Sequence, residues 1–249
     1  LINNELVIYY NYFDKDKNFL DKRLIGNLRI ELINNKLSVL KYIYRNTPIL
    51  PDSPLHKMMS FIDKMFWCRG TTNIDANYLF PTYFSDILEE LYASSKKDDL
   101  QEFLKENELN YNLQRNNNND THELLVVFPS GKKAKFLSIA STGTKSLFLF
   151  FYWSVMTFSY ISFLFVDEFD AFLHYESAEN IVLRLNKNRN FQSFLTSHNT
   201  YLMQNKLTRP DCCFIMTENK VSSLFNCASK EIRQAHNLEK LYINGAFNE

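Results

Sequence analysis

The sequence of 249 residues contains few glycines and no excess of charge of either sign. None of the five glycines stands in the pattern G-x-x-x-x-G-K-[ST], the loop that wraps a phosphate group in many nucleotide-binding proteins. Lysine plus arginine number 28, as do aspartate plus glutamate, so the formal net charge is +0. This balance excludes a global electrostatic attraction to nucleic acid or to an anionic membrane, while leaving room for a local basic patch.

Cysteine is also scarce, and none of the four cysteines belongs to a zinc-binding spacing. We therefore expect reduced structural thiols in a cytoplasmic protein. No signal peptide is present, but residue 1 is Leu rather than Met. Because this suggests that the true start lies upstream, N-terminal targeting cannot be judged from this sequence.

One run without charge extends from Ser146 to Val166 and is long enough to span a lipid bilayer. Several hydroxyl-bearing residues interrupt it, among them Ser154, Thr157, Ser159, Tyr160 and Ser162. The run also divides naturally into a helical part at 144–158 and a strand part at 161–166. We therefore favour a buried helix followed by a central strand over a membrane segment.

The first 120 residues predict a variable lobe of strands followed by helices. Short apolar runs in residues 1–45 predict strands, with turns at 14–18 and 33–36. Apolar residues at helical spacing predict an amphipathic helix from Leu55 to Phe66, and residues 86–104 predict one or two more helices. The polar run at 116–120 has no packing capacity and marks the expected lobe boundary.

Residues 121–249 alternate between strand and helix patterns. A hairpin with strands at 122–128 and 132–139 is expected around the turn at 129–132. The helix and strand described above follow it, and then a helix at 176–185 and a strand at 191–197. A short helix near 200–205, strands at 212–217 and 221–225, and a helix at 230–241 complete the expected order. Such alternation of apolar strands with helices predicts an α/β sheet covered by helices on both faces.

The strongest chemical signal is the segment ISFLFVDE, residues 161–168. A buried strand ends there in two carboxylates, at the edge where α/β sheets bind their ligands. Asp167 would hold Mg²⁺, and Glu168 would orient or deprotonate a water molecule beside a γ-phosphate. Taken alone, the segment fits a simple acidic turn at the surface about equally well.

Two further segments have the chemistry of a phosphate site. His198 follows the strand at 191–197, where an imidazole can hydrogen-bond a γ-phosphate, although a helix-capping role is the better explanation of that histidine alone. Residues 141–147 (STGTKSL) open a helix with hydroxyls, a glycine and free backbone N–H groups, which together form an anion site. The alternative for this segment is an ordinary helix start capped by Ser141.

In this order, the three segments resemble an ABC-type ATPase. The segment 141–147 looks like the signature loop, Asp167 and Glu168 like Walker B, and His198 like the switch histidine. Three segments are similar to those of the bacterial AAA-type ATP-binding proteins related to the overcoming-lysogenization-defect and SMC-like ATPases. They are FVDEFDAFLH, TSHNTYLM and HNLEKLYINGAFNE. The resemblance covers residues 121–249 well and the first 120 residues only loosely.

This resemblance implies a P-loop NTPase-like fold that uses ATP and Mg²⁺ in a head-to-tail homodimer. Ser141, Gly143 and Thr144 would face the γ-phosphate bound to the other protomer, while Asp170 and His174 occupy the place of the D-loop at the subunit interface. In the family, such a core commonly serves phage defence or DNA maintenance, often beside a nuclease or toxin partner. Nucleic acid binding rests on this analogy alone.

One departure from the family concerns the phosphate-binding loop. Gly143-Thr-Lys-Ser comes near it, but Thr144 separates the glycine from Lys145, and Ser138 stands where the first glycine belongs. In the family the loop lies near the N-terminus, so we expect an ATPase core that is incomplete at its N-terminus. The alternative is a degenerate relative that dimerises or binds a partner without hydrolysing ATP.

Overall fold

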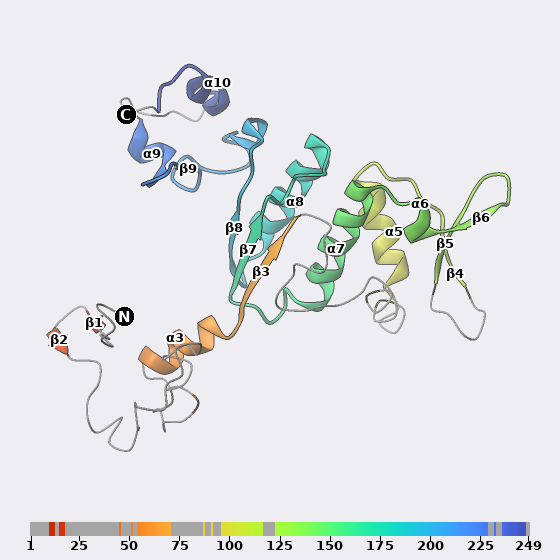
Figure 1. Cartoon of the computed structure of the whole chain (residues 1–249), viewed down its shortest axis with the longest axis horizontal. Helices are drawn as coiled ribbons and strands as arrows, with labels where there is room; N and C mark the ends of the chain where they lie inside the picture. Colours follow the sequence, from red (N-terminus) through yellow and green to blue (C-terminus); the bar gives the residue numbers. More distant parts are fainter. Residues whose placement is uncertain are drawn as a thin grey trace. The chain divides into compact units, whose positions relative to one another are not determined.

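The computed structural model describes residues 10–12, 15–17, 45, 51, 54–70, 87, 91, 96–116, 123–228, 232 and 236–247 (Figure 1). The chain divides into two compact units between Lys64 and Met65. The sequence placed its lobe boundary near residue 120 instead. All residues for which the sequence predicted a chemical role belong to the larger unit, which begins at Met65.

The described residues of the smaller unit include a two-stranded antiparallel sheet and helix α3 (Pro54–Ile62). Strands β1 (Tyr10–Tyr12) and β2 (Lys15–Lys17) pair, so part of the turn predicted at 14–18 is a strand. The other strands predicted in this region lie outside the described residues. Helix α3 begins with a proline. Proline suits the first helical position because an N–H there would have no partner within the helix.

The larger unit is built around three parallel strands in the order β3-β7-β8. They are β3 (Met65–Arg69), β7 (Phe163–Asp167) and β8 (Gln192–Leu195). The prediction that the helix from Leu55 continues through Phe66 is wrong, because α3 ends at Ile62 and β3 begins three residues later. Burial in β3 alternates with a period of two, which is the pattern of a strand.

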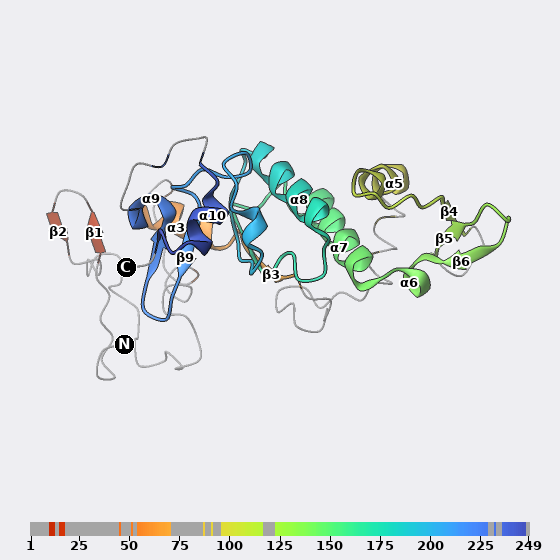
Figure 2. The same ribbon diagram turned by 90° about the horizontal axis from the view of Figure 1, so that it is seen from above.

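Two helices cover one face of this sheet (Figure 2). They are α7 (Thr142–Met156) and α8 (Tyr175–Lys187). Phe66 and Leu164 point to this face and are buried, and the Phe66 ring lies edge-on to Trp153 of α7 at 5.7 Å. On the other face, Trp67 and Phe194 remain 36% and 39% exposed. The cover that the sequence predicted for that second face is not found among the described residues.

The uncharged run of residues 146–166 forms most of helix α7 and most of strand β7. It separates into α7 and β7 as predicted, and both elements belong to the main core. Within the described part of the chain, no helix is long and apolar enough to cross a membrane.

A second, antiparallel sheet of three strands has the order β4-β5-β6. Its strands are β4 (Leu113–Arg115), β5 (Leu124–Val127) and β6 (Lys133–Lys135). The hairpin of β5 and β6 is confirmed, and Gly131 adopts a φ of 79° in its turn, where glycine carries no steric penalty. The strand expected to run on to residue 139 stops at Lys135, where the short helix α6 (Phe136–Ile139) begins. Helix α5 (Lys97–Glu106) contacts α7.

The C-terminal segment has a small core of its own, formed by Leu224, Leu238 and Phe247. Its elements are the 3-10 helix η3 (Thr200–Leu202), the hairpin of β9 (Phe214–Met216) and β10 (Val221–Ser223), and helices α9 (Leu224–Cys227) and α10 (Leu238–Ile243). Helix α10 has its N-cap at Asn237. The first part of the helix predicted at 230–241 lies largely outside the described residues. A hydrogen bond of 3.3 Å between Thr200 and Glu239 joins η3 to α10.

Candidate functional site: the carboxyl end of the parallel sheet

The two carboxylates singled out in the sequence lie together at the end of the central strand. Asp167 is the last residue of β7, and Glu168 follows it. The Thr196 hydroxyl, one residue beyond β8, donates to Asp167 Oδ1 at 2.6 Å and accepts from the Glu168 backbone N–H at 2.8 Å. Thr196 therefore fixes one carboxylate oxygen of Asp167 and leaves Oδ2 for another partner.

Glu168 has a backbone conformation that is rare for a residue with a side chain. Its φ is 49°, in the left-handed region, at a cost on the order of 1 kcal/mol. Successive side chains of a regular strand point to opposite faces of the sheet. The left-handed turn interrupts this alternation, and both adjacent carboxylates therefore reach the same cation.

That cation is Arg69, the last residue of β3, which sequence reasoning did not single out. The register of the two parallel strands places Arg69 beside Asp167. Arg69 Nε lies 3.3 Å from Asp167 Oδ2 and 3.8 Å from Glu168 Oε2. We call Arg69, Asp167, Glu168 and Thr196 the acidic edge. The only sign of Arg69 in the sequence was the apolar run of residues 65–68 that precedes it.

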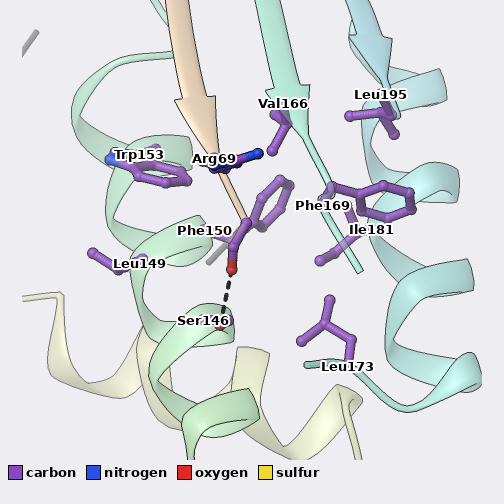
Figure 3. A pocket seen from close by; sticks show the side chains of 11 residues that line it. Arg69, Ser146, Leu149, Phe150, Trp153, Val166, Phe169, Leu173, Ile181 and Leu195 are labelled. Carbon is purple, nitrogen blue, oxygen red and sulfur yellow. Dashed lines mark hydrogen bonds between the residues drawn. The ribbon is translucent and has the colours of Figure 1, made fainter. Parts of the chain in front are cut away.

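Gly70 allows the ends of β3 and β7 to approach each other closely. Its N–H donates to the Asp167 carbonyl at 2.7 Å. A Cβ at this position would lie 2.2 Å from the Glu168 carbonyl oxygen and 2.7 Å from Phe169 Cα, both backbone atoms that no rotamer change can move. The carbonyl of Gly70 accepts a hydrogen bond from Ser146 of α7 at 3.3 Å (Figure 3).

The turn after β7 and the loop after β8 are also joined by a hydrogen bond. Ser197 Oγ donates to Asp170 Oδ2 at 2.7 Å, so the aspartate in the place of the D-loop is held by the loop that carries His198. His198 itself is exposed, next to the acidic edge in sequence through Ser197 and Thr196. His174 is exposed as well and occupies the N-cap position of α8 without a side-chain capping bond.

At residues Ser141–Thr144, which we call the α7 start, the Ser141 and Thr144 hydroxyls bond within the fold. Ser141 is the N-cap of α7, and its Oγ accepts from the Thr144 N–H at 3.1 Å, as the capping alternative predicted. Thr144 is only 2% exposed, and its hydroxyl lies 2.9 Å from Ser141 Oγ. A Cβ on Gly143 would lie 2.4 Å from the Phe172 carbonyl oxygen, so the glycine lets the turn after β7 pack against the helix.

A small cavity lies beneath the acidic edge, between the sheet and the two helices (Figure 3). Its volume of about 20 Å³ is room for roughly one water molecule. Apolar side chains dominate its wall, among them Phe150 and Trp153 from α7 and Ile181 from α8. The cavity is therefore too small for a nucleotide, and any ligand of the acidic edge would lie on its solvent side.

Cys68, on the opposite face of β3 from Arg69, is a structural thiol. Its side chain is fully buried, and its Sγ lies 3.8 Å from the Phe165 carbonyl oxygen. Burial raises the pKa of the Cys68 thiol well above its usual range. The thiolate, which is the reactive form, is therefore absent at neutral pH.

The acidic edge has the donor groups that a magnesium ion prefers. No cluster of three or more His, Cys, Asp or Glu side chains suited to a metal occurs in the described part of the chain. Mg²⁺ requires no such cluster, since one or two carboxylates, phosphate oxygens and water complete its shell. Asp167 Oδ2 and the Glu168 carboxylate, 29% and 35% exposed as side chains, fit a Mg²⁺ ion that arrives with phosphates.

The parallel sheet with helices packed on it places the larger unit in the class of α/β domains, a class whose ligands commonly bind at the carboxyl ends of the strands. A family model described as "AAA domain, putative AbiEii toxin, Type IV TA system" matches residues 12–204. This is more than half of the chain, which therefore belongs to this family of AAA domains. The AAA-type family predicted from the sequence is thus confirmed. No curated protein and no solved structure matches the chain.

Proposed function

We propose that the acidic edge is the metal and water site of an ATPase that hydrolyses ATP with Mg²⁺. The observation that carries this proposal is the pair Asp167 and Glu168 at the end of the central parallel strand, joined by the Thr196 hydroxyl. Membership of the AAA family supports nucleotide binding. The position of the site at the carboxyl end of the sheet agrees with the general location of ligands in α/β domains.

Asp167, Glu168 and His198 would each have a separate role in this reaction. Asp167 would hold Mg²⁺, which supplies neutralisation of the phosphate charge when bound. Glu168 would accept a proton from the water whose oxygen attacks the γ-phosphorus, while the bond to the β-phosphate oxygen breaks and ADP leaves. His198, exposed beyond β8, would donate a hydrogen bond to the γ-phosphate.

The composite site would be completed by a second protomer in a head-to-tail homodimer. Ser141, Gly143 and Thr144 would face the γ-phosphate held by that protomer, and Asp170 and His174 would lie at the interface. Because the Thr144 side chain is buried and its N–H and hydroxyl both bond to Ser141, its part in this contact would be to hold Ser141 in place. The reaction also requires a phosphate-binding loop from a segment or subunit outside these 249 residues.

The name of the matching family suggests a biological setting. It mentions an AbiEii toxin and a type IV toxin–antitoxin system. We therefore infer a role in phage defence, with a toxin or nuclease as protein partner, whereas a role in DNA maintenance rests on analogy. Pull-down of the tagged chain from its own host, followed by mass spectrometry, tests this setting. Recovery of neither a toxin-system protein nor a nuclease would contradict it.

The absence of a G-x-x-x-x-G-K-[ST] loop from these residues favours a second candidate. In that case the chain is a dimerisation or interaction module without turnover. Calorimetry of the 249-residue chain with Mg-ATP separates the two roles for the chain itself. We expect weak or no binding, and an affinity in the micromolar range would contradict this expectation.

The ATPase proposal is tested in the complete product of the gene. Phosphate release from ATP is measured for the wild type and for Glu168→Gln, which keeps the size of the side chain but cannot accept a proton. Equal rates for both proteins would overturn the assignment of the catalytic residue. A rate of zero for the wild type, together with a stable dimer, would support the interaction module instead.

A further inference from the structure

The position of Arg69 affects how a metal can enter the acidic edge. Arg69 Nε lies 3.3 Å from Asp167 Oδ2, while Asp167 Oδ1 accepts the hydrogen bond from Thr196. Both oxygens of the metal-binding carboxylate therefore already have partners. A divalent cation at Oδ2 would stand beside a positive charge, and like charges repel at this range.

The guanidinium cannot give up its charge to make room, because arginine stays protonated in proteins. It can move, however. The Arg69 side chain is 46% exposed, and ion pairs of such exposure are weak and exchangeable. A guanidinium is also a favoured partner of phosphate oxygens. An anionic phosphate group near the edge would therefore attract Arg69 at the moment when a cation attracts Asp167.

We propose that Arg69 is a resident counter-ion of the acidic edge, which a divalent cation must displace from Asp167. The edge then favours a metal that arrives with phosphates over the free ion, because the phosphates take the displaced guanidinium. Arg69 is in this respect a positioning residue that controls the metal site. The inference rests on the proposed function, since it concerns the metal site of that ATPase.

A metal-binding experiment without nucleotide tests the inference on the 249-residue chain. Mn²⁺ is used as the probe, and its free concentration is measured by electron paramagnetic resonance. Replacing Arg69 by Met keeps much of the side-chain volume and removes the charge. We expect Arg69→Met to bind Mn²⁺ about tenfold more tightly than the wild type, because a unit charge about 4 Å from the ion is removed. Arg69→Lys, which keeps the charge, should remain close to the wild type.

A matched control is Arg184→Met on α8. Arg184 is also 46% exposed and pairs with a carboxylate, Glu106, at 3.5 Å, but it lies outside the acidic edge. This variant should leave Mn²⁺ affinity unchanged. The double variant with Arg69→Met and Asp167→Asn should lose the gain, which locates the bound ion at the acidic edge.

Equal or weaker Mn²⁺ binding by Arg69→Met, or no measurable binding by either protein, would overturn the inference. If circular dichroism shows that Arg69→Met does not fold, Arg69→Gln decides the question, since it keeps a hydrogen-bonding group for the carboxylates. The experiment involves no ATP. Loss of the ATPase assignment through Glu168→Gln and loss of this inference are therefore separate outcomes.

Discussion

The acidic edge and the α7 start are both rich in polar groups, but the fold uses these groups differently. At the acidic edge, Asp167 and Glu168 stay about one-third exposed. Their partners come from distant parts of the sequence, because Arg69 ends β3 and Thr196 follows β8. At the α7 start, Ser141 and Thr144 bond to each other within one turn of helix. Exposed carboxylates that are held by residues distant in the sequence are typical of a ligand site. Local bonding of the same kinds of atoms is sufficient to begin a helix.

The largest effect that would sharpen this comparison concerns turnover. In the complete gene product, Glu168→Gln should lower the rate of ATP hydrolysis by about 10²–10⁴-fold, the usual contribution of a general base. ATP binding should persist, because the neutral side chain keeps its size. Glu176→Gln, at an exposed position in the first turn of α8, is the control and should leave the rate unchanged. A similar loss in both variants would point to a general effect of charge.

The next effect concerns the close contact of β3 with β7. Gly70→Ala should lower the free energy of unfolding by about 3 kcal/mol, because the new Cβ meets fixed backbone atoms. Gly131→Ala is the matched control, since its Cβ meets nothing but its φ is 79°. It should cost only about 1 kcal/mol. Urea denaturation measures both, and equal losses would show that the contact at Gly70 relaxes easily.

A smaller effect is expected from the Thr196 hydroxyl, which joins the Asp167 carboxylate to the Glu168 backbone N–H. Thr196→Val keeps the shape of the side chain but leaves Asp167 Oδ1 and the Glu168 N–H without this partner, which should cost about 1–2 kcal/mol. Thr196→Ser keeps the hydroxyl and should recover most of this loss. Thermal unfolding of the three proteins provides the measurement. Equal stability of Thr196→Val and wild type would mean that water replaces the hydroxyl completely.

The smallest effect is expected at the α7 start, where a loss of more than a helix cap would show that this segment resembles the acidic edge. Ser141→Ala removes the cap of α7 and should lower stability by about 1 kcal/mol, as for other N-caps. The control is Asn237→Ala, which removes the equivalent cap of α10. In the complete gene product, a loss of ATP hydrolysis in Ser141→Ala that Asn237→Ala does not show would support the proposed contact of Ser141 with the γ-phosphate. An unchanged rate would leave Ser141 as a helix cap alone.

Local patterns in the sequence predicted the elements whose signal is local. The helix and strand within the uncharged run, α8, and the hairpin of β5 and β6 all follow from periodicity, turn residues and apolar runs. Strand β3 was missed because Met58, Met59, Ile62, Met65 and Phe66 continue a helical spacing across the end of α3. What makes residues 65–69 a strand is parallel pairing with β7, nearly one hundred residues away. Parallel strands are not joined by a short turn that could be recognised in the sequence.

The same reason explains what was found and missed at the acidic edge. Asp167 and Glu168 end an apolar run, and a single segment is enough to notice them. Arg69 and Thr196 acquire their roles only from neighbouring strands, through the register of β3 and the end of β8. The left-handed conformation of Glu168 also has no local signal, because its residue type does not favour it.

Gly70 and Gly143 have a mechanical consequence for the larger unit. At Gly70 the main chain of β3 lies against the main chain after β7, and at Gly143 the main chain of α7 lies against the same turn at Phe172. Side chains in contact can accommodate small movements by changing rotamer, but backbone atoms in contact cannot. A displacement of the first turn of α7 would therefore be transmitted to the turn after β7, which contains Glu168, with little loss of amplitude.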